Sequence, residues 1–319
     1  MRKFIAAAVA GLALLAANTP ASAWPDRNVR FIVSLGPGSG VDLTARLVGE
    51  ALAKKWGQSV VVENRPGGDG IVAINAFIGA NDDHILLFTP TGAYASHPFQ
   101  HEKIPYDLNQ LAPIARVTNT IVAIGVPGSL GVNSIKELVA KIKAEPGKLN
   151  FAAATATNEF LFRGYLKEMG LDMPKVPYRD TVSAINDLGE NRIQAYVGAY
   201  AIMRPQIQSG RVKMLAVTNK QRAKGAPDLQ TVTEAGEPKL TFDGLVGIFG
   251  PTKMPPDVRE KIAADVKAVV EDPEINGKLV ATGQNVNPGG PAEFAAEMNA
   301  QIKEVARVAK ELDIRPGQN

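Results

Sequence analysis

The sequence predicts an α/β protein of two domains, in which helices cover parallel sheets. Short β-branched runs alternate with segments of helical periodicity along most of the chain. The chain has 319 residues, which suggests two domains rather than one. It has no cysteine, so the packing of apolar cores rather than disulfides must hold these domains together.

The first segment has the pattern of a cleavable secretory signal. Arg2 and Lys3 provide a positive start, residues 4–17 form an apolar run, and small residues end at Ala23. The run is too short to cross a bilayer comfortably. We therefore expect cleavage after Ala23 and a mature chain that is free in the periplasm. An uncleaved membrane anchor is the alternative, whereas a lipid tether is excluded because there is no cysteine.

The overall charge balance argues against two classes of partner. The formal net charge is +3, and two of those positive charges, on Arg2 and Lys3, lie in the leader. A nearly neutral mature chain has no electrostatic basis for binding nucleic acid or an anionic membrane surface. No later stretch is apolar and long enough to span a membrane.

The first half of the mature chain alternates strands and helices. A β-branched run at 29–34 ends in a glycine-rich loop, and the helix expected at 42–55 has Leu43, Leu47, Ala51 and Leu52 on one face. The next elements expected are a strand at 59–63, a turn at 64–68, a helix at 71–80 and a strand at 85–89.

Two apolar stretches within 112–126 indicate a crossing into a second domain, where the alternation restarts. The helix expected at 134–143 begins with Ser134 and Glu137, which are spaced as a capping box. We expect helices also at 159–169, 182–188, 256–270 and 291–312, and strands at 149–153, 175–177, 195–198, 214–217 and 247–250. The last helix has an apolar stripe of Phe294, Met298, Ile302, Val305 and Val308.

The predicted domain boundaries follow from these crossings. After a signal of residues 1–23, residues 24–122 and 247–319 form the first domain, and residues 123–246 form the second. Two chain crossings between the domains would leave a cleft between them, where a small molecule could be captured.

The loop at 36–42 is the most informative local feature. Its glycines lie between a strand and a helix, where the free N–H groups of the helix favour an anion. The candidate binding residues are Gly38, Ser39, Gly40, Val41 and Asp42. We expect Asp42 to cap the helix and order water, because its charge repels an anionic ligand. The alternative is a simple tight turn.

Three familiar functions of such a loop are disfavoured. It lacks the lysine of a nucleotide-binding P-loop. Leu43 occupies the position of the third glycine in a dinucleotide fingerprint, and Ser39 has Pro37 and Val41 where a nucleophile elbow needs glycines.

Two loops in the second half have a similar composition. One offers Thr155, Thr157 and Asn158, and the other offers Tyr178, Asp180 and Thr181, each directly before or within the start of a helix. Each alone is consistent with simple capping. Together with the first loop, they predict that helix N-termini from two domains converge on a ligand with two anionic ends.

Catalytic chemistry has little support in the sequence. The three histidines are His84, His97 and His101, and Pro98 argues against a helical metal pair. All three are expected in loops or on the surface. There is no cysteine or serine elbow to act as a nucleophile. We expect no catalytic residue, no metal and no cofactor, and hence a protein that is not an enzyme.

The mature chain resembles the tripartite tricarboxylate transporter substrate-binding proteins, also called the Bug family. The resemblance covers nearly all of 24–314 and is specific through the order and spacing of its motifs. These motifs are Trp24-Pro25-Asp26-Arg27, Gly38-Ser39-Gly40-Val41-Asp42, Val62-Glu63-Asn64-Arg65-Pro66-Gly67, Pro105-Tyr106-Asp107, Pro146-Gly147-Lys148-Leu149-Asn150-Phe151, Val176-Pro177-Tyr178-Arg179, Leu215-Ala216-Val217-Thr218 and Thr231-Val232-Thr233-Glu234-Ala235-Gly236.

The resemblance implies a Venus-flytrap fold, the two-domain periplasmic binding protein of type 2 topology. It also implies that the protein delivers a captured carboxylate to the integral membrane subunits of a transporter. The three loops described above would hold the ligand, with water often bridging its carboxylate in the first domain. We expect this protein to be a monomer.

The chain departs from the family pattern in the second domain. Arg179-Asp180-Thr181 stands where Lys-Gly-Ser is common, and Gly198 replaces a frequent aspartate. A buried aspartate would suit the ammonium of an amino acid. Its absence favours a mono- or dicarboxylate without an amine, on whose aliphatic or aromatic body Tyr200 could pack. Two other functions stay open: a sensor subunit that binds a signalling kinase when loaded, and an exported α/β enzyme.

Overall fold

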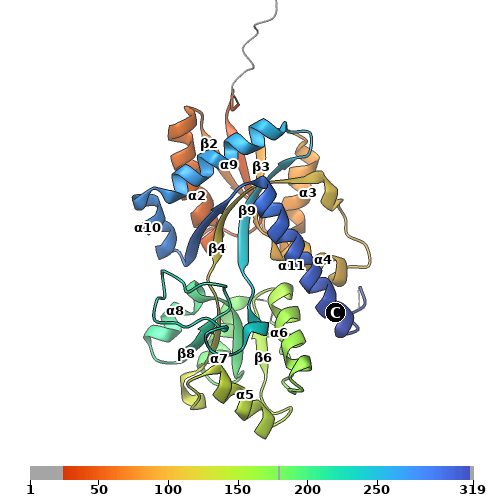
Figure 1. Ribbon diagram of the computed structural model, residues 1–319, viewed down its shortest axis with the longest axis vertical. Coiled ribbons are helices and arrows are strands. Elements are labelled where there is room, and N and C mark those ends of the chain that lie inside the picture. Colours follow the sequence, from red (N-terminus) through yellow and green to blue (C-terminus); the bar gives the residue numbers. More distant parts are fainter. Residues whose placement is uncertain (1–23, 179, 317–319) are drawn as a thin grey trace, which may run out of the picture.

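The computed structural model describes residues 24–178 and 180–316. Two sheets lie one beyond the other along the longest axis of the molecule, each with helices packed around it (Figure 1). The predicted signal sequence lies outside the described residues. Within the described part of the chain, no helix has the length and apolar character that crossing a membrane requires.

The first sheet has six strands in the order β10-β4-β9-β3-β1-β2. In chain order, these are β1 (Val29–Val33), β2 (Val60–Asn64), β3 (Ile85–Pro90), β4 (Leu111–Thr120), β9 (Gly244–Pro251) and β10 (Gln284–Gly289). The first three strands are parallel, with Phe31 opposite Val62 on one side and Leu86 on the other. The expectation of purely parallel sheets is wrong here, because β9 returns from the second sheet and runs antiparallel to β3 and β4.

The second sheet has four strands in the order β6-β7-β5-β8. They are β5 (Val122–Pro127), β6 (Phe151–Ala153), β7 (Ala195–Ala199) and β8 (Val212–Val217). The chain leaves the first sheet after Thr120 and is back in it at Gly244.

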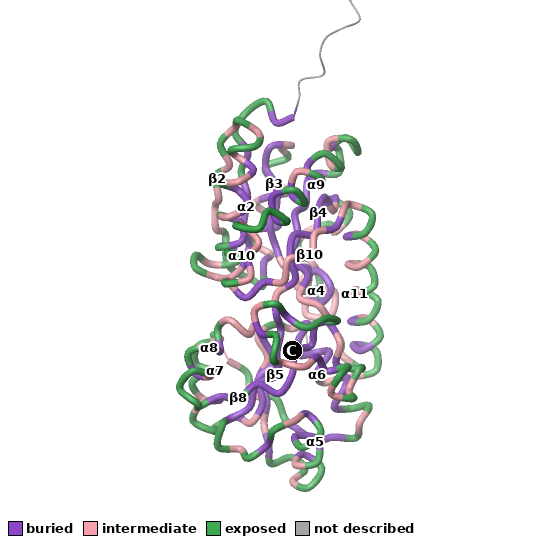
Figure 2. Tube along the Cα trace, turned by 60° about the vertical axis from the view of Figure 1, so that its left-hand side comes forward, coloured by how far each residue is buried: buried purple, intermediate pink, exposed green. Residues whose placement is uncertain are grey.

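Ten helices with the following bounds surround the sheets among the described residues. Around the first sheet are α2 (Gly40–Trp56), α3 (Ile71–Ala80), α4 (Gly92–Gln100), α9 (Pro256–Glu271), α10 (Pro273–Ala281) and α11 (Pro291–Glu311). Around the second sheet are α5 (Ile135–Ala144), α6 (Ala156–Glu168), α7 (Thr181–Gly189) and α8 (Tyr200–Gln208). Buried positions follow the strands of both sheets, and exposed positions follow the outer helices (Figure 2).

Two details of the predicted elements are corrected. Helix α2 begins at Gly40, and its buried apolar face consists of Val41, Ala45, Val48 and Leu52, while Leu43 is 39% exposed. The buried face differs from the predicted one because the residues that face the core at helical spacing begin with Val41 rather than with Leu43. The strand expected at 175–177 is reduced to a single bridge from Phe151 to Lys175.

Four elements were not predicted: α4, α8, α10 and β10. Helices α4 and α8 contain Pro98 and Pro205, and proline is unfavourable in the interior of a helix. Short helices are stabilised mainly by packing onto their neighbours, so their local sequence need not show a strong helical pattern.

Helix α11 belongs to both halves of the molecule. Its first turns pack Phe294 on Phe249 of the first sheet, while Val305 and Val308 lie in the apolar core of the second. Gly164 of α6 allows a close approach, because a Cβ there would lie 2.7 Å from Val308 Cγ1. The C-terminal helix therefore joins the two lobes on one side (Figure 1).

Candidate ligand-binding site

A cavity of about 320 Å³ lies between the two sheets. Loops at strand ends, both chain crossings and the start of β10 contribute to its lining. The lining residues are Leu35, Ser39, Gly40, Val41, Pro90, Gly92, Thr120, Val122, Ala154, Thr155, Thr157, Asn158, Thr181, Ala199, Ala201, Ile202, Phe242, Asp243, Gly244, Leu245, Thr282, Gly283, Gln284 and Gln301.

The N-termini of helices α2, α4, α6, α7 and α8 meet at this cavity, since the first or capping residue of each is part of the lining. The first N–H groups of a helix have no partner within the helix and carry partial positive charge. Among the described residues that line the cavity, Asp243 is the only charged one. Backbone N–H groups and hydroxyls are therefore the donors that the described lining offers to a bound anion.

The loop before α2 is held in shape by Asp42. Its buried carboxylate accepts hydrogen bonds from Gly38 N (2.8 Å), from Asn64 Nδ2 (2.8 Å) and from Arg46 Nε (3.2 Å). Burial alone would raise the pKa of Asp42, but the hydrogen bonds from Arg46, Asn64 and Gly38 outweigh it and lower the pKa. Gly38 has a φ of 81°, which favours glycine. Asp42 and Gly38 thus shape the loop, and neither lines the cavity.

The start of α6 connects the two lobes across the cavity. Thr155 caps the helix, with its Oγ1 accepting from Asn158 N at 3.2 Å. Thr157 Oγ1 donates to the carbonyl of Gly92 at the start of α4, at 2.6 Å. Because α4 follows the first sheet and α6 follows the second, this hydrogen bond holds the lobes together at the cavity.

The structure brings seven of the predicted site residues to the cavity and leaves six outside its lining. Ser39, Gly40, Val41, Thr155, Thr157, Asn158 and Thr181 line it, whereas Gly38, Asp42, Tyr178, Asp180, Gly198 and Tyr200 do not.

Each residue of the second lobe that lies outside has a structural reason. Asp180 caps α7 by accepting from Ser183 N at 2.8 Å. The Tyr178 hydroxyl donates to Asp187 Oδ2 at 2.7 Å. The guanidinium carbon of Arg204 lies over the Tyr200 ring, 5.8 Å from the ring centre. Tyr200 is not among the lining residues, so the structure does not support the expected packing of its ring on the ligand.

Gly198 faces the interior of the second lobe. A Cβ at this position would lie 2.5 Å from the ring of Tyr196, which is fully buried. The Tyr196 ring therefore occupies the space that a side chain on residue 198 would need.

The sequence did not predict the lining contributed by the crossing strands, by Thr282, Gly283 and Gln284, or by Gln301. These residues are far from the three loops in sequence, and only the packing of strands brings them near. The sequence contained a signal for one of the missed segments. Gly92 begins α4 one residue after the buried strand β3, just as the other loops follow their strands.

One of the three histidines is placed differently from the prediction: His97 lies buried in a helix, whereas His84 lies in a turn and His101 directly follows α4. His84 and His97 are buried, at 3% and 0% exposure. His97 lies within α4, and its Nδ1 is 2.5 Å from the Tyr106 hydroxyl oxygen. Burial, together with the nearby His101, lowers the pKa of His97 to about 4.

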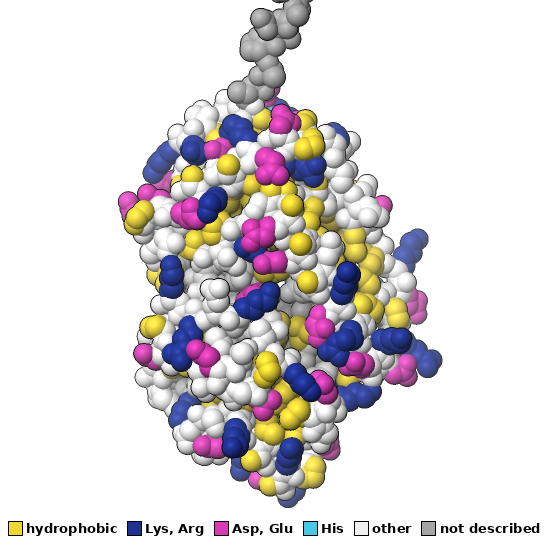
Figure 3. Space-filling model, viewed as in Figure 1, with side chains coloured by type: hydrophobic (Ala, Val, Ile, Leu, Met, Phe, Trp, Pro, Cys, Tyr) yellow, Lys and Arg dark blue, Asp and Glu magenta, His cyan; other side chains and the backbone are white. Residues whose placement is uncertain are grey.

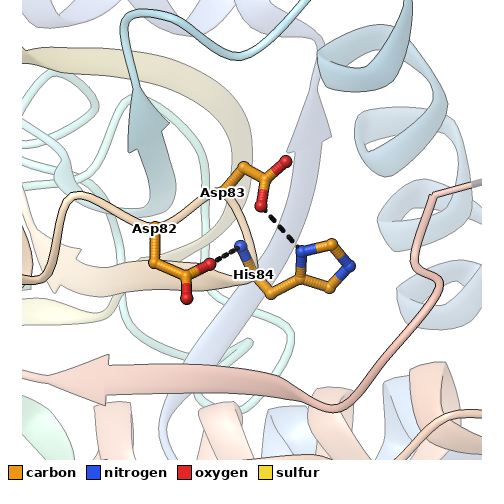
Figure 4. Close-up of side chains that lie close together, drawn as sticks. All are labelled: Asp82, Asp83 and His84. Carbon is orange, nitrogen blue, oxygen red and sulfur yellow. Dashed lines mark hydrogen bonds and ion pairs between the residues drawn. The ribbon is translucent and has the colours of Figure 1, made fainter.

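Within the described part of the chain, Asp82, Asp83 and His84 are close enough together to hold a metal ion (Figure 4). Their polar atoms already have protein partners. Arg27 donates to Asp82 at 2.8 Å and to Asp83 at 3.1 Å, and His84 Nδ1 is 2.8 Å from Asp83 Oδ1. The hydrogen bond from Arg27 lowers the pKa of Asp82 to about 2 despite some burial. The guanidinium therefore supplies the positive charge, and the cluster anchors the N-terminal segment.

On the face drawn in Figure 3, Lys and Arg side chains are interspersed with Asp and Glu side chains. Such a surface offers no broad electrostatic attraction to a polyanion.

Two sheets with a cavity between them, and with helix N-termini directed into it, define a periplasmic binding protein of the two-domain type. Solved structures support this class. BugD, a periplasmic binding protein, is 26% identical with a TM-score of 0.74, covering 92% of this chain and 100% of its own. Rpa4515 of R. palustris, solved with adipate, is 24% identical with a TM-score of 0.80, covering 92% of this chain and 99% of its own.

The sequence comparisons identify the family. The family model described as the tripartite tricarboxylate transporter family receptor matches residues 44–314, and the chain belongs to this family. A UPF0065 protein of Bordetella bronchiseptica is 29% identical over 95% of this chain and 92% of its own. BugT of Bordetella pertussis is 25% identical over 93% of each chain.

Proposed function

We propose that this protein is a periplasmic receptor that captures a small carboxylate and delivers it to the membrane subunits of a tripartite tricarboxylate-type transporter. It acts as a monomer after removal of its signal sequence. The observation that carries the proposal is the cavity itself, in which the N-termini of five helices meet.

The proposed mechanism follows from this lining. The backbone N–H groups at the starts of α2 and α6 and nearby hydroxyls pair with the carboxylate or carboxylates of the ligand. Apolar side chains such as Leu35, Ile202 and Phe242 contact its body. The ligand contacts both lobes at once, so it stabilises their closed arrangement by its higher affinity for that arrangement.

The neighbours support a carboxylate. One solved structure, Rpa4515, contains adipate, and another, MatC of Rhodopseudomonas palustris, contains malate. The MatC structure is 23% identical to this chain with a TM-score of 0.73. Both ligands named are dicarboxylates, and we extend their chemical class rather than their identity to this protein.

We propose further that the ligand, a mono- or dicarboxylic acid with an aliphatic or aromatic body, lacks an amine. An ammonium group inside the cavity would need an acidic partner. Asp243 is the acidic residue of the described lining, and its Oδ1 already accepts from Asn219 Nδ2 at 3.2 Å and from Lys220 N at 3.3 Å. An amino acid would leave its ammonium poorly compensated.

A thermal-shift screen tests the proposal. The panel contains adipate, malate, hexanoate and benzoate, with aspartate and glutamate as amino-acid counterparts and adipamide as the neutral control. We expect at least one simple acid to raise the unfolding temperature and adipamide to leave it unchanged. Stabilisation by the amino acids but not by the simple acids contradicts the missing amine. Turnover of a bound acid contradicts the receptor function, and mass spectrometry of the acid that copurifies identifies the natural ligand.

A further inference from the structure

Two glutamines line the cavity, and the protein uses their amides differently. Gln284 is the first residue of β10, and Gln301 lies on α11. In each, the side-chain oxygen accepts a hydrogen bond from a threonine hydroxyl. The two residues differ in whether the side-chain amide nitrogen has a hydrogen-bond acceptor within the protein.

The amide of Gln301 is satisfied within the protein. Its Oε1 accepts from Thr91 Oγ1 at 2.6 Å, and its Nε2 donates to the backbone carbonyl of Asp243 at 3.1 Å. This side chain links α11 to the loop before α4 and to the strand crossing, and its structural role accounts for its polar groups.

The amide of Gln284 is satisfied on one side only. The residue is 2% exposed, and its Oε1 accepts from Thr118 Oγ1 at 3.0 Å and from Thr120 Oγ1 at 3.3 Å. These two hydroxyls hold the oxygen toward β4, so the nitrogen must point the other way. Among the described residues, no acceptor binds Gln284 Nε2. Because Gln284 lines the cavity, this nitrogen is available to donate to a ligand or to water there.

The nitrogen points to the start of α2. Gln284 Nε2 lies 2.9 Å from the position that a Cβ on Gly40 would occupy. The N–H groups of Gly40 and Val41 are the first of the helix and have no acceptor among the described residues. Three donors from two distant parts of the chain therefore gather at one end of the cavity.

We propose that Gln284 donates through Nε2 to the ligand carboxylate bound at the N-terminus of α2, and that this contact favours anionic over neutral ligands. The inference rests on the proposed carboxylate-binding function and assigns a specificity residue within it. Gln284 complements the backbone N–H groups of Gly40 and Val41 because a carboxylate oxygen accepts more than one hydrogen bond.

The test compares two Gln284 variants with one control, using the tightest-binding acid of adipate, malate, hexanoate and benzoate in isothermal titration. Gln284→Met removes the donor and should weaken binding by about 10- to 100-fold, the range for a hydrogen bond to a charged group. Gln284→Glu retains an acceptor for Thr118 and Thr120, so it should fold even if the methionine variant does not. The control is Gln206→Met, which alters a buried glutamine of α8 outside the cavity whose Nε2 donates to Asn186 Oδ1 at 3.1 Å.

The pH profile separates a donor from a merely structural residue. As the pH is lowered from about 8 to about 5, the affinity of Gln284→Glu relative to that of the unmodified protein should increase. The reason is that the Glu carboxyl, once protonated, regains a hydrogen-bond donor and loses its charge. A flat ratio, or unchanged binding in Gln284→Met, overturns the inference. Equal weakening in Gln206→Met overturns it as well. If the unmodified protein binds none of the four acids, the proposed function fails instead, which is a different result.

Discussion

The three glycines of the loop before α2 should respond differently to the same alanine substitution. Gly36 has no atom within 4 Å of an added Cβ and no positive φ. Gly38 also has free space, but its φ is 81°. At Gly40 the added Cβ would lie 2.9 Å from Gln284 Nε2 and 3.1 Å from the carbonyl oxygen of Thr282.

The expected magnitudes follow from these environments. Gly36→Ala should stabilise the protein by about 0.4–1 kcal/mol, because alanine restricts the unfolded chain. Gly38→Ala should destabilise it by about 1–2 kcal/mol through left-handed strain. Gly40→Ala should destabilise it by about 1–3 kcal/mol, because the Thr282 carbonyl belongs to the backbone and cannot rotate away.

Thermal unfolding and ligand titration of the three variants check this order. For a chain of this size, a change of about 1 kcal/mol in unfolding free energy shifts the unfolding temperature by about 1–2 °C. Gly36→Ala should keep its affinity. Gly40→Ala should lose affinity as well as stability, since its methyl group separates the N-terminus of α2 from Gln284. If Gly40→Ala has the same unfolding temperature and ligand affinity as the unmodified protein, β10 does not approach α2 as closely as described.

Three further predictions concern the loop, the helix contact and the acidic cluster. Asp42→Asn should destabilise the protein by about 1–3 kcal/mol near neutral pH by weakening the contact with Arg46. Folding lowers the pKa of Asp42, so the difference in unfolding free energy between the variant and the unmodified protein should be complete above about pH 4 and should vanish as the pH falls further. Urea unfolding at several pH values measures it, and a difference that does not change with pH contradicts the prediction. Gly164→Ala should cost about 1–3 kcal/mol by pressing on α11, and Val308→Ala in the same chain should recover part of that cost; additive effects would argue against the contact. Adding Zn²⁺ or EDTA should leave the unfolding temperature unchanged because Arg27 already pairs with the acidic cluster, and stabilisation by the metal would show that the ion displaces it.

Local sequence patterns were sufficient to predict most of the individual helices and strands. The helix at 71–80 was predicted with its observed bounds, and the apolar stripe of α11 contains the buried residues Phe294, Val305 and Val308. These successes share a cause, because periodicity and capping residues act over a few neighbouring positions. Failures arose where packing overrides a local signal, as at Pro98 in α4 and at Leu43 on the exposed side of α2.

The candidate site divides in the same way. The three predicted loops do begin helices, and residues from each line the cavity, because a loop between a strand and a helix places the helix N-terminus at the strand end. Whether a side chain within such a loop faces the ligand or the scaffold was not predictable for Asp180 and Tyr178. Each is turned away by a hydrogen bond to its own lobe.

The sequence by itself determined the class of this protein, through its alternation of strands and helices, its anion-favouring loops and its ordered family motifs. The tertiary structure alone decided which groups meet at the cavity. Gly198 lies against Tyr196, and Gln284 approaches Gly40 from the far end of the chain. The physical reason is range: capping and periodicity are local, whereas contact between β10 and α2 depends on how all the strands of the first sheet pair and pack.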